Sequence, residues 1–150
     1  FFHSGGPAGE SVALERIVGD GPWAGSRTRL VDDSNLGTYL VEVLDPSTNQ
    51  VIYSRGYASI FAEWLTAPEA KTTAGTFHES VRFPWPRRAV QVVLKKRDTK
   101  NTFREVWSTV IDPASRAVNP ASTGTGRRAG PDRECRVERP GSRLGRDRVP

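Results

Sequence analysis

The chain has 150 residues, 36% of them hydrophobic, and a formal net charge of +5 at pH 7. This length suffices for one domain with a hydrophobic core, and no apolar run approaches the roughly 20 residues that a membrane-spanning helix needs. Cys135 is the only cysteine, which excludes an internal disulfide and a cysteine-based zinc site.

Six segments carry the alternation of apolar and polar residues that is typical of short strands. A loop rich in Gly and Pro follows the first segment and carries Trp23. Residues 46–49 and 99–101 have turn-forming compositions, so the strands on either side of each are expected to form hairpins. The predicted strands are residues 11–18, 37–45, 50–58, 76–84, 89–98 and 102–112.

One segment, residues 59–70, has a helical pattern. Ile60, Phe61, Trp64 and Leu65 fall on one face of a helix, and Pro68 limits that helix to a turn or two. Strands joined by turns, with at most one short helix and no alternation of strand and helix, predict an all-β fold of the antiparallel β-sandwich type.

Residues 120–150 have a different composition. They contain no Phe, Trp, Tyr, Ile or Lys and are dominated by Arg, Gly and Pro. Such a segment cannot bury enough apolar surface to offset the entropy of ordering it, so we predict a disordered tail. The tail holds 8 of the 22 basic and 4 of the 17 acidic residues, which leaves residues 1–119 with a net charge of only +1.

Three interpretations of the basic tail remain open: an arm for nucleic acid or an acidic surface, a linker, and the product of a frameshift in a GC-rich gene. The last two are favoured because the tail lacks the aromatic residues that single-strand binders place among basic ones. The nearly neutral body also argues against nucleic acid as a partner. The chain contains no methionine and no signal peptide, so we expect it to be a piece or a processed form of a longer protein.

Several uncommon segments of the body carry a family resemblance. They are GPWAGSRTRLVDDSNLGTYLVEVLD, IYSRGYASIFAEW, TFHESVRFPWP, VQVVLKKRD and FREVWSTVID. In this order they resemble the N-terminal domain of the M64 family of metallopeptidases, also called the IgA peptidase M64 family. The resemblance covers residues 1 to about 119, and the tail departs from the family pattern, which is consistent with a truncated or frameshifted product.

The resemblance implies a β-sandwich domain, residues 1–119, that stands before a zinc peptidase domain in a larger, typically secreted, bacterial protein. It therefore implies a secreted, cell-surface or periplasmic location. The zinc-binding His-Glu-x-x-His helix belongs to the catalytic domain of that family and does not occur in this chain. We accordingly expect no cofactor here, and zinc only in the absent catalytic domain.

The segment TFHESVR, residues 76–82, contains half of the His-Glu-x-x-His motif, with Arg82 where the second histidine would stand. On a strand, His78 and Glu79 point to opposite faces and cannot share a metal. Arg82 is a permanent cation that would repel one, and His3 is the only other histidine. We therefore predict neither a catalytic nor a metal-binding residue in this segment.

Glu79 lies in an apolar row of its predicted strand, and Arg55 lies in the row Val51, Tyr53, Arg55, Tyr57. An unpaired buried charge is costly, so one hypothesis is a structural ion pair between Arg55 and Glu79. The alternative is that one of the rows faces solvent and that the two side chains never meet.

Two tryptophans are candidates for a partner surface. Trp85 stands between two prolines and cannot lie in a regular central strand, so it either plugs the end of the sandwich or forms an exposed platform for sugar or protein. The plug is favoured because large aromatic side chains mostly serve packing. Trp64, on the predicted helix, is the second candidate for an exposed aromatic contact.

Two charged clusters have ordinary structural explanations. Residues 32–35, Asp-Asp-Ser-Asn, group several oxygens but lack the spacing of a calcium loop, so a turn is favoured. Residues 95–97, Lys-Lys-Arg, together with Arg87 and Arg88, are expected to form a solvated edge rather than an anion site.

These observations predict a non-catalytic accessory domain that packs on the catalytic domain of an M64 peptidase in cis, or presents substrate to it. The alternative is a free-standing module that binds glycan or protein. A nucleic-acid binder that acts through the tail is a third and less favoured class.

Overall fold

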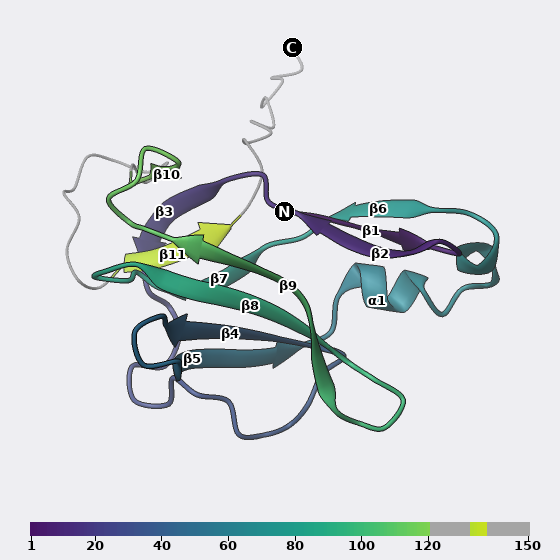
Figure 1. Ribbon diagram of the computed structural model, residues 1–150, viewed down its shortest axis with the longest axis horizontal. Helices are drawn as coiled ribbons and strands as arrows, with labels where there is room; N and C mark the ends of the chain where they lie inside the picture. Colours follow the sequence, from purple (N-terminus) through teal and green to yellow (C-terminus); the bar gives the residue numbers. More distant parts are fainter. Residues whose placement is uncertain (121–132, 138–150) are drawn as a thin grey trace, which may run out of the picture.

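The computed structural model describes residues 1–120 and 133–137, and these residues form three β-sheets with one short α-helix (Figure 1). The fold is thus mostly β, as the sequence predicts. The strands are β1 (Phe2–Gly6), β2 (Gly9–Ala13), β3 (Ile17–Pro22), β4 (Tyr39–Asp45), β5 (Gln50–Tyr57), β6 (Gly75–His78), β7 (Val81–Pro84), β8 (Val90–Arg97), β9 (Phe103–Ile111), β10 (Val118–Asn119) and β11 (Arg133–Val137); the helices are α1 (Ile60–Trp64) and the 3₁₀ turn η1 (Pro68–Lys71).

Sheet C has the order β5-β4-β8-β9, and all of its strands are antiparallel. It contains both predicted hairpins. The β4–β5 turn is held by Asp45, whose carboxylate accepts a 2.9 Å hydrogen bond from the Ser47 N–H. The β8–β9 turn is held in the same way by Asp98, which accepts from the N–H groups of Lys100 and Thr102. Both turns therefore form where composition predicts them.

Sheet B has the order β10-β3-β11-β7. Strand β11 pairs antiparallel with β3 on one side and with β7 on the other, and the short β10 runs parallel to β3. Figure 1 shows sheet B beside sheet C, with β11 in its interior. The prediction of a disordered tail is therefore wrong for residues 133–137, while residues 121–132 and 138–150 lie outside the described residues.

Sheets B and C enclose one hydrophobic core, which confirms the predicted β-sandwich. Alternate residues of each strand point inward, as the two-residue period of a strand requires. All of the following are buried and belong to one cluster: Ile17, Val81, Phe83, Val118 and Cys135 from sheet B, and Tyr39, Val41, Val43, Tyr53, Val90, Val92, Leu94 and Ile111 from sheet C.

Sheet A, with the order β2-β1-β6, forms a third unit at one end of the sandwich, and α1 lies next to it (Figure 1). The helix begins at Ser59, whose hydroxyl accepts from the Ala62 N–H at 3.1 Å. Phe61 of α1 is fully buried and lies over β1, where Gly5 leaves room for it: a Cβ at Gly5 would be 2.5 Å from the phenyl ring.

Two predicted strands are each divided in the structure because the chain passes from sheet A to sheet B. The segment 76–84 supplies β6, which pairs with β1, and then β7, which pairs with β11. The segment predicted at 11–18 likewise contributes to β2 and to β3. Strand β1 was not predicted, since its Gly-rich sequence FHSGG lacks a strand pattern. Within the described residues, no helix has the length and apolar character needed to cross a membrane.

Candidate functional site

The segment TFHESVR is extended and alternates between two faces, as predicted. Phe77, Glu79 and Val81 point inward, whereas His78 and Arg82 are exposed. His78 Nε2 lies 3.2 Å from a carboxylate oxygen of Glu15, away from Glu79. Among residues 1–120 and 133–137, no group of three His, Cys, Asp or Glu side chains is arranged to hold a metal ion.

The second histidine, His3, stands at the centre of a buried polar network. It lies on β1, and its side chain is 0% exposed. Its Nε2 is 2.8 Å from Glu10 Oε1, and its Nδ1 is 2.9 Å from Glu79 Oε2. Since both ring nitrogens face carboxylates, the arrangement favours the imidazolium form of His3, in which both nitrogens carry protons.

Glu10, on β2, connects this network to sheet C. The hydroxyl of Tyr39 on β4 donates to Glu10 Oε1 at 2.9 Å, and the ammonium of Lys96 on β8 pairs with Glu10 Oε2. Glu79 contributes from the link between β6 and β7. The network thus joins sheet A to the sandwich through charge-assisted hydrogen bonds, which are the stronger kind.

The protonation states follow from these contacts. Burial lowers the pKa of His3, but the hydrogen bonds to Glu10 and Glu79 outweigh it and raise the pKa above 6.5. Burial raises the pKa of Glu10, but hydrogen bonds from His3, Lys96 and Tyr39 outweigh it and lower the pKa to about 2. Burial also raises the pKa of Glu79, but the interactions with its partners, chiefly the hydrogen bond from His3, outweigh burial and lower the pKa. Both carboxylates are therefore ionised beside a protonated imidazole.

Aromatic rings enclose the imidazolium. The ring centroid of Phe61 lies 3.9 Å from that of His3, with 30° between the planes. The ring of Tyr39 lies 5.0 Å away at 71°, an edge-on arrangement. A cation that lies against one aromatic face and is hydrogen-bonded at both nitrogens is held in one orientation. It has no free lone pair with which to bind a metal or to take up a proton.

The proposed pair of Arg55 and Glu79 does not form, because Glu79 takes His3 as its partner. Arg55 lies on the inner face of β5, opposite Val41, but β5 is the edge strand and the side chain is exposed. Among the described residues, Arg55 makes no side-chain hydrogen bond or ion pair, but its charge helps to lower the pKa of the Asp32 carboxyl. The buried charge of Glu79 did indicate a partner, but His3 was overlooked because β1 was not predicted.

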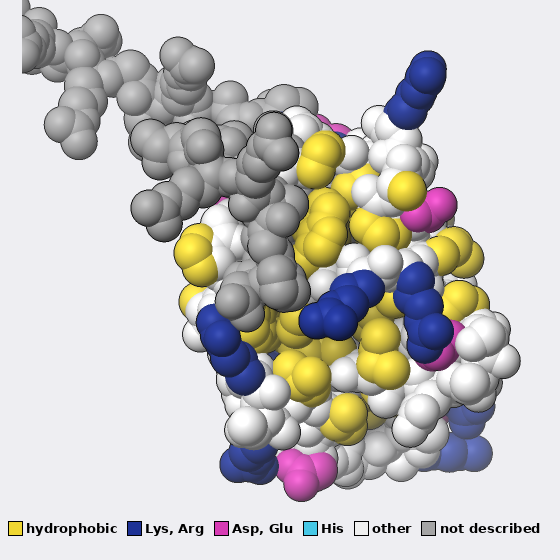
Figure 2. All heavy atoms as spheres, turned by 90° about the vertical axis from the view of Figure 1, so that its left-hand side faces the viewer, with side chains coloured by type: hydrophobic (Ala, Val, Ile, Leu, Met, Phe, Trp, Pro, Cys, Tyr) yellow, Lys and Arg dark blue, Asp and Glu magenta, His cyan; other side chains and the backbone are white. Residues whose placement is uncertain are grey.

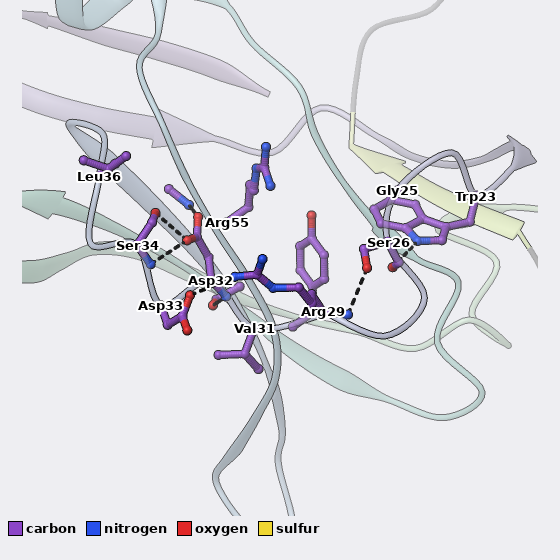
Figure 3. Close-up of a pocket in the computed structure, with 13 residues that line it drawn as sticks. Trp23, Gly25, Ser26, Arg29, Val31, Asp32, Asp33, Ser34, Leu36 and Arg55 are labelled. Carbon is purple, nitrogen blue, oxygen red and sulfur yellow. Dashed lines mark hydrogen bonds and ion pairs between the residues drawn. The ribbon is translucent and has the colours of Figure 1, made fainter.

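Arg55 instead lines a cleft of about 660 Å³ between β5 and the loop that contains residues 23–36 (Figure 3). Trp23 stands at one end of the cleft, where its indole N–H donates to the Ser26 carbonyl at 3.0 Å, and its ring meets Tyr53 edge-on at 5.8 Å. On the loop side of the cleft, the Arg29 guanidinium lies 3.4 Å from the Asp33 carboxylate. The lining thus combines aromatic faces with exposed charges of both signs.

The cleft continues into a second hollow of about 390 Å³ that leads toward the sandwich interior. Trp23, Tyr53 and Arg55 line both hollows. The second one reaches Val41 in the core and residues 80–82 at the start of β7. The opening therefore lies where the edges of sheets B and C diverge, and Arg55 stands at its rim.

The loop beside the cleft is anchored by Asp32. Its carboxylate accepts from the hydroxyl and the N–H of Ser34, at 2.6 and 3.0 Å, and from the Gly56 N–H of β5 at 2.9 Å. The Ser34 hydroxyl and these two N–H groups lower the pKa of Asp32 to about 2. Residues 32–35 thus form the predicted turn, and the carboxylate is used to attach that turn to the sheet.

The cationic residues 95–97 are also engaged. Lys95 pairs with Glu42 at 2.7 Å, Lys96 pairs with Glu10, and the Arg97 guanidinium donates to the carbonyl of Gly37 at 2.8 Å. These contacts fix β8 to its neighbours and to the loop before β4. Residues 95–97 therefore do not form an anion site.

Trp64 and Trp85 are half-buried packing residues. The Trp64 ring lies 5.4 Å from Phe77 and 6.1 Å from Phe61, and so covers the surface between α1 and β6. Trp85 packs over β3, where a Cβ at Gly19 would be only 3.0 Å from its ring. This position favours the plug over the exposed platform.

Residues 1–108 match the family model described as Peptidase M64 N-terminus. The match spans strands β1 to β8 and most of β9, and it ends before β10 and β11. A comparison with curated proteins gave no match.

Proposed function

Because the chain belongs to the Peptidase M64 N-terminus family, we propose that it is a non-catalytic accessory domain that packs on an M64 catalytic domain in cis or presents substrate to it. The match over residues 1–108 is the observation that carries this proposal. The family is described by its position at the N-terminus of M64 peptidases. An accessory role, a bacterial origin and a secreted, cell-surface or periplasmic location are parts of the proposal.

The chemistry of the described residues supports a structural rather than a catalytic role. His3 has both nitrogens occupied, and Glu10 is engaged by His3, Tyr39 and Lys96. Glu79 Oε2 is engaged by His3, whereas Glu79 Oε1 is buried without a hydrogen-bond partner among the described residues. A general base needs a free lone pair within reach of a substrate proton. The residue types used in hydrolysis are present here, but they are buried and joined to one another.

The surface supports a protein partner. In Figure 2, hydrophobic side chains gather over the centre of the face shown, with Lys and Arg side chains among them. Elsewhere, Val110 on the edge strand β9 is 63% exposed, close to the point where the family match ends. The family match ends within β9, so we place the contact with the catalytic domain beside Val110.

The proposal is tested by pairing the chain with the separately expressed catalytic domain of an M64 peptidase. We expect saturable binding by calorimetry, weakened by Val110→Glu and unaffected by Ile52→Glu, an equally apolar exposed site on the opposite edge strand. We also expect a lower KM for a folded protein substrate, with kcat for a short peptide unchanged. No binding and no effect on either substrate would refute the proposal.

A second candidate, a module that binds glycan or protein, is favoured by the cleft beside β5. Trp23 and Tyr53 offer apolar faces, and Arg55 offers a guanidinium that has no hydrogen bond within the described part of the chain. This combination suits a polar ligand with one apolar face. Binding on a glycan or peptide array that is lost in Arg55→Ala and retained in Arg87→Ala would support this candidate. The absence of any ligand on both arrays would remove it.

A further inference from the structure

Strand β11 fills a gap in sheet B with residues that lie beyond the family match. The match ends at residue 108, whereas β11 spans Arg133–Val137. We propose that the space between β3 and β7 is an acceptor site for one extended peptide strand, and that residues 133–137 are its ligand in this chain. This inference does not rest on the proposed function.

The pairing shows that the space is one strand wide. Arg136 is opposite Val18 of β3 and Arg82 of β7, and Val137 is opposite Ile17 and Val81, with both neighbours antiparallel. Adjacent strands lie about 4.8 Å apart, so β3 and β7 are about 10 Å apart and cannot bond to each other. Without β11, both would present unpaired edges to the gap.

An empty space between β3 and β7 would destabilise sheet B. With β11 in place, the flanking positions are buried: Ile17 is 4% exposed, Val18 6%, Val81 7% and Phe83 1%. Without β11, these apolar side chains would lose part of their cover, and the backbone groups along both edges would lose their partners within the sheet. An incoming strand would satisfy two edges at once and would complete the cover over the core. The strand that provides this pairing and cover comes from outside the region that the family model matches.

The centre of the gap selects a small side chain. Cys135 is 0% exposed, lies in the hydrophobic core, and pairs with Gly19 on one side and with Phe83 on the other. Gly19 has no side chain, and the Trp85 ring closes the space above it. The ligand is therefore an extended segment, antiparallel to both neighbours, with a small apolar residue at its centre. Main-chain hydrogen bonds give such complexes their affinity, and the small space around Cys135, beside Gly19 and the Trp85 ring, gives specificity.

The site is tested in the complete chain by replacing residues 123–129 with a site for a sequence-specific protease and cutting the folded protein. We expect the C-terminal fragment to remain bound through size-exclusion chromatography. A labelled peptide of residues 131–139 with Cys135→Ala should then exchange into the gap. The uncut chain should bind that peptide at least about tenfold more weakly, because its own strand competes at a high effective concentration.

Peptide variants give the matched control. A peptide with Cys135→Pro should bind at least about tenfold more weakly than the Cys135→Ala peptide, since proline removes a ladder hydrogen bond and does not fit a central strand. Separation of the fragment from the body after cutting would overturn the proposal. Equal binding of the alanine and proline peptides, or equal binding to cut and uncut chains, would overturn it as well.

A second measurement needs no cutting. In the uncut chain, the buried Cys135 thiol should react with a disulfide reagent at least about a hundredfold more slowly than in denaturant, since only the thiolate in contact with solvent reacts. Reaction at the rate of the unfolded chain would show that the strand is not seated in the gap and would contradict the proposal.

Discussion

The buried network around His3 makes a quantitative prediction for Glu10→Gln. This substitution keeps the shape of the side chain but removes the charge that faces His3, Lys96 and Tyr39. The Glu10 side chain is only 15% exposed, so water can replace little of what is lost. We expect the variant to fold with the same topology and a lower free energy of unfolding.

The magnitude follows from the pKa of Glu10. A fall from 4.5 to about 2 corresponds to roughly 3 kcal/mol, at about 1.4 kcal/mol for each pH unit. Removing one partner of a buried ion pair costs about 3–5 kcal/mol in general, which agrees with this value. For a chain of this size, a loss of about 3 kcal/mol lowers Tm by about 10 °C.

The stability that Glu10 contributes depends on pH. Because the folded pKa of Glu10 is lowered, its contribution is present above the unfolded value of 4.5 and is lost as the pH falls through about 2. Urea unfolding followed by tryptophan fluorescence at pH 7 and at pH 2 measures the difference between wild type and Glu10→Gln. The difference should be about 3 kcal/mol at pH 7 and should nearly vanish at pH 2.

A matched control is Glu69→Gln, because Glu69 is exposed on η1 and its side chain makes no hydrogen bond within the described residues. Its effect should stay within about 0.5 kcal/mol at both pH values. The reasoning fails if Glu10→Gln is as stable as the wild type at pH 7, or if its loss of stability is the same at pH 2.

Three further outcomes follow from the structure. Because the pKa of His3 is raised, the stability that His3 contributes should be complete below pH 6.5 and should be lost as the pH rises through its folded pKa. Urea unfolding at pH 6 to 9, together with NMR titration of the imidazole, would measure this loss. Gly37→Ala should lower the free energy of unfolding in urea by more than about 2 kcal/mol, because φ at Gly37 is +87° and the new Cβ would lie 2.5 Å from the Tyr57 nitrogen. Gly9→Ala should lower it by less, because φ is +120° there but the space around the residue is open. Arg55→Ala should change the free energy of unfolding by no more than about 0.5 kcal/mol, since its side chain is exposed and makes no hydrogen bond among the described residues; a larger loss would mean that it has a structural partner.

The sequence predicted those parts of the fold that depend on local patterns. The two hairpins of sheet C combine alternating strands with turns rich in Asn, Asp and Ser, and both form as expected. The extended conformation of residues 76–83 also follows from alternation, which is why His78 and Glu79 point apart. Strand period and turn chemistry act over a few residues and can be seen in one sequence.

The parts that depend on distant pairing were not predicted. Strand β1 has two glycines and a short polar sequence, and it is a strand only because β2 and β6 pair with it. Without a predicted strand at β1, no sequence pattern gave a reason to place His3 beside Glu79, although it is the partner of Glu79. Strand β11 has the composition of the basic tail, and its inclusion in sheet B depends on the space between β3 and β7. Tertiary context overrides local propensity at all three places.

The central claim, that this chain is an accessory domain and not a peptidase, is tested most directly by an activity assay. The purified chain would be incubated with zinc and a protein substrate, with and without a chelator. We predict no cleavage above the background of a chain-free control in either condition. Proteolysis that depends on the chain and disappears with the chelator would contradict the claim.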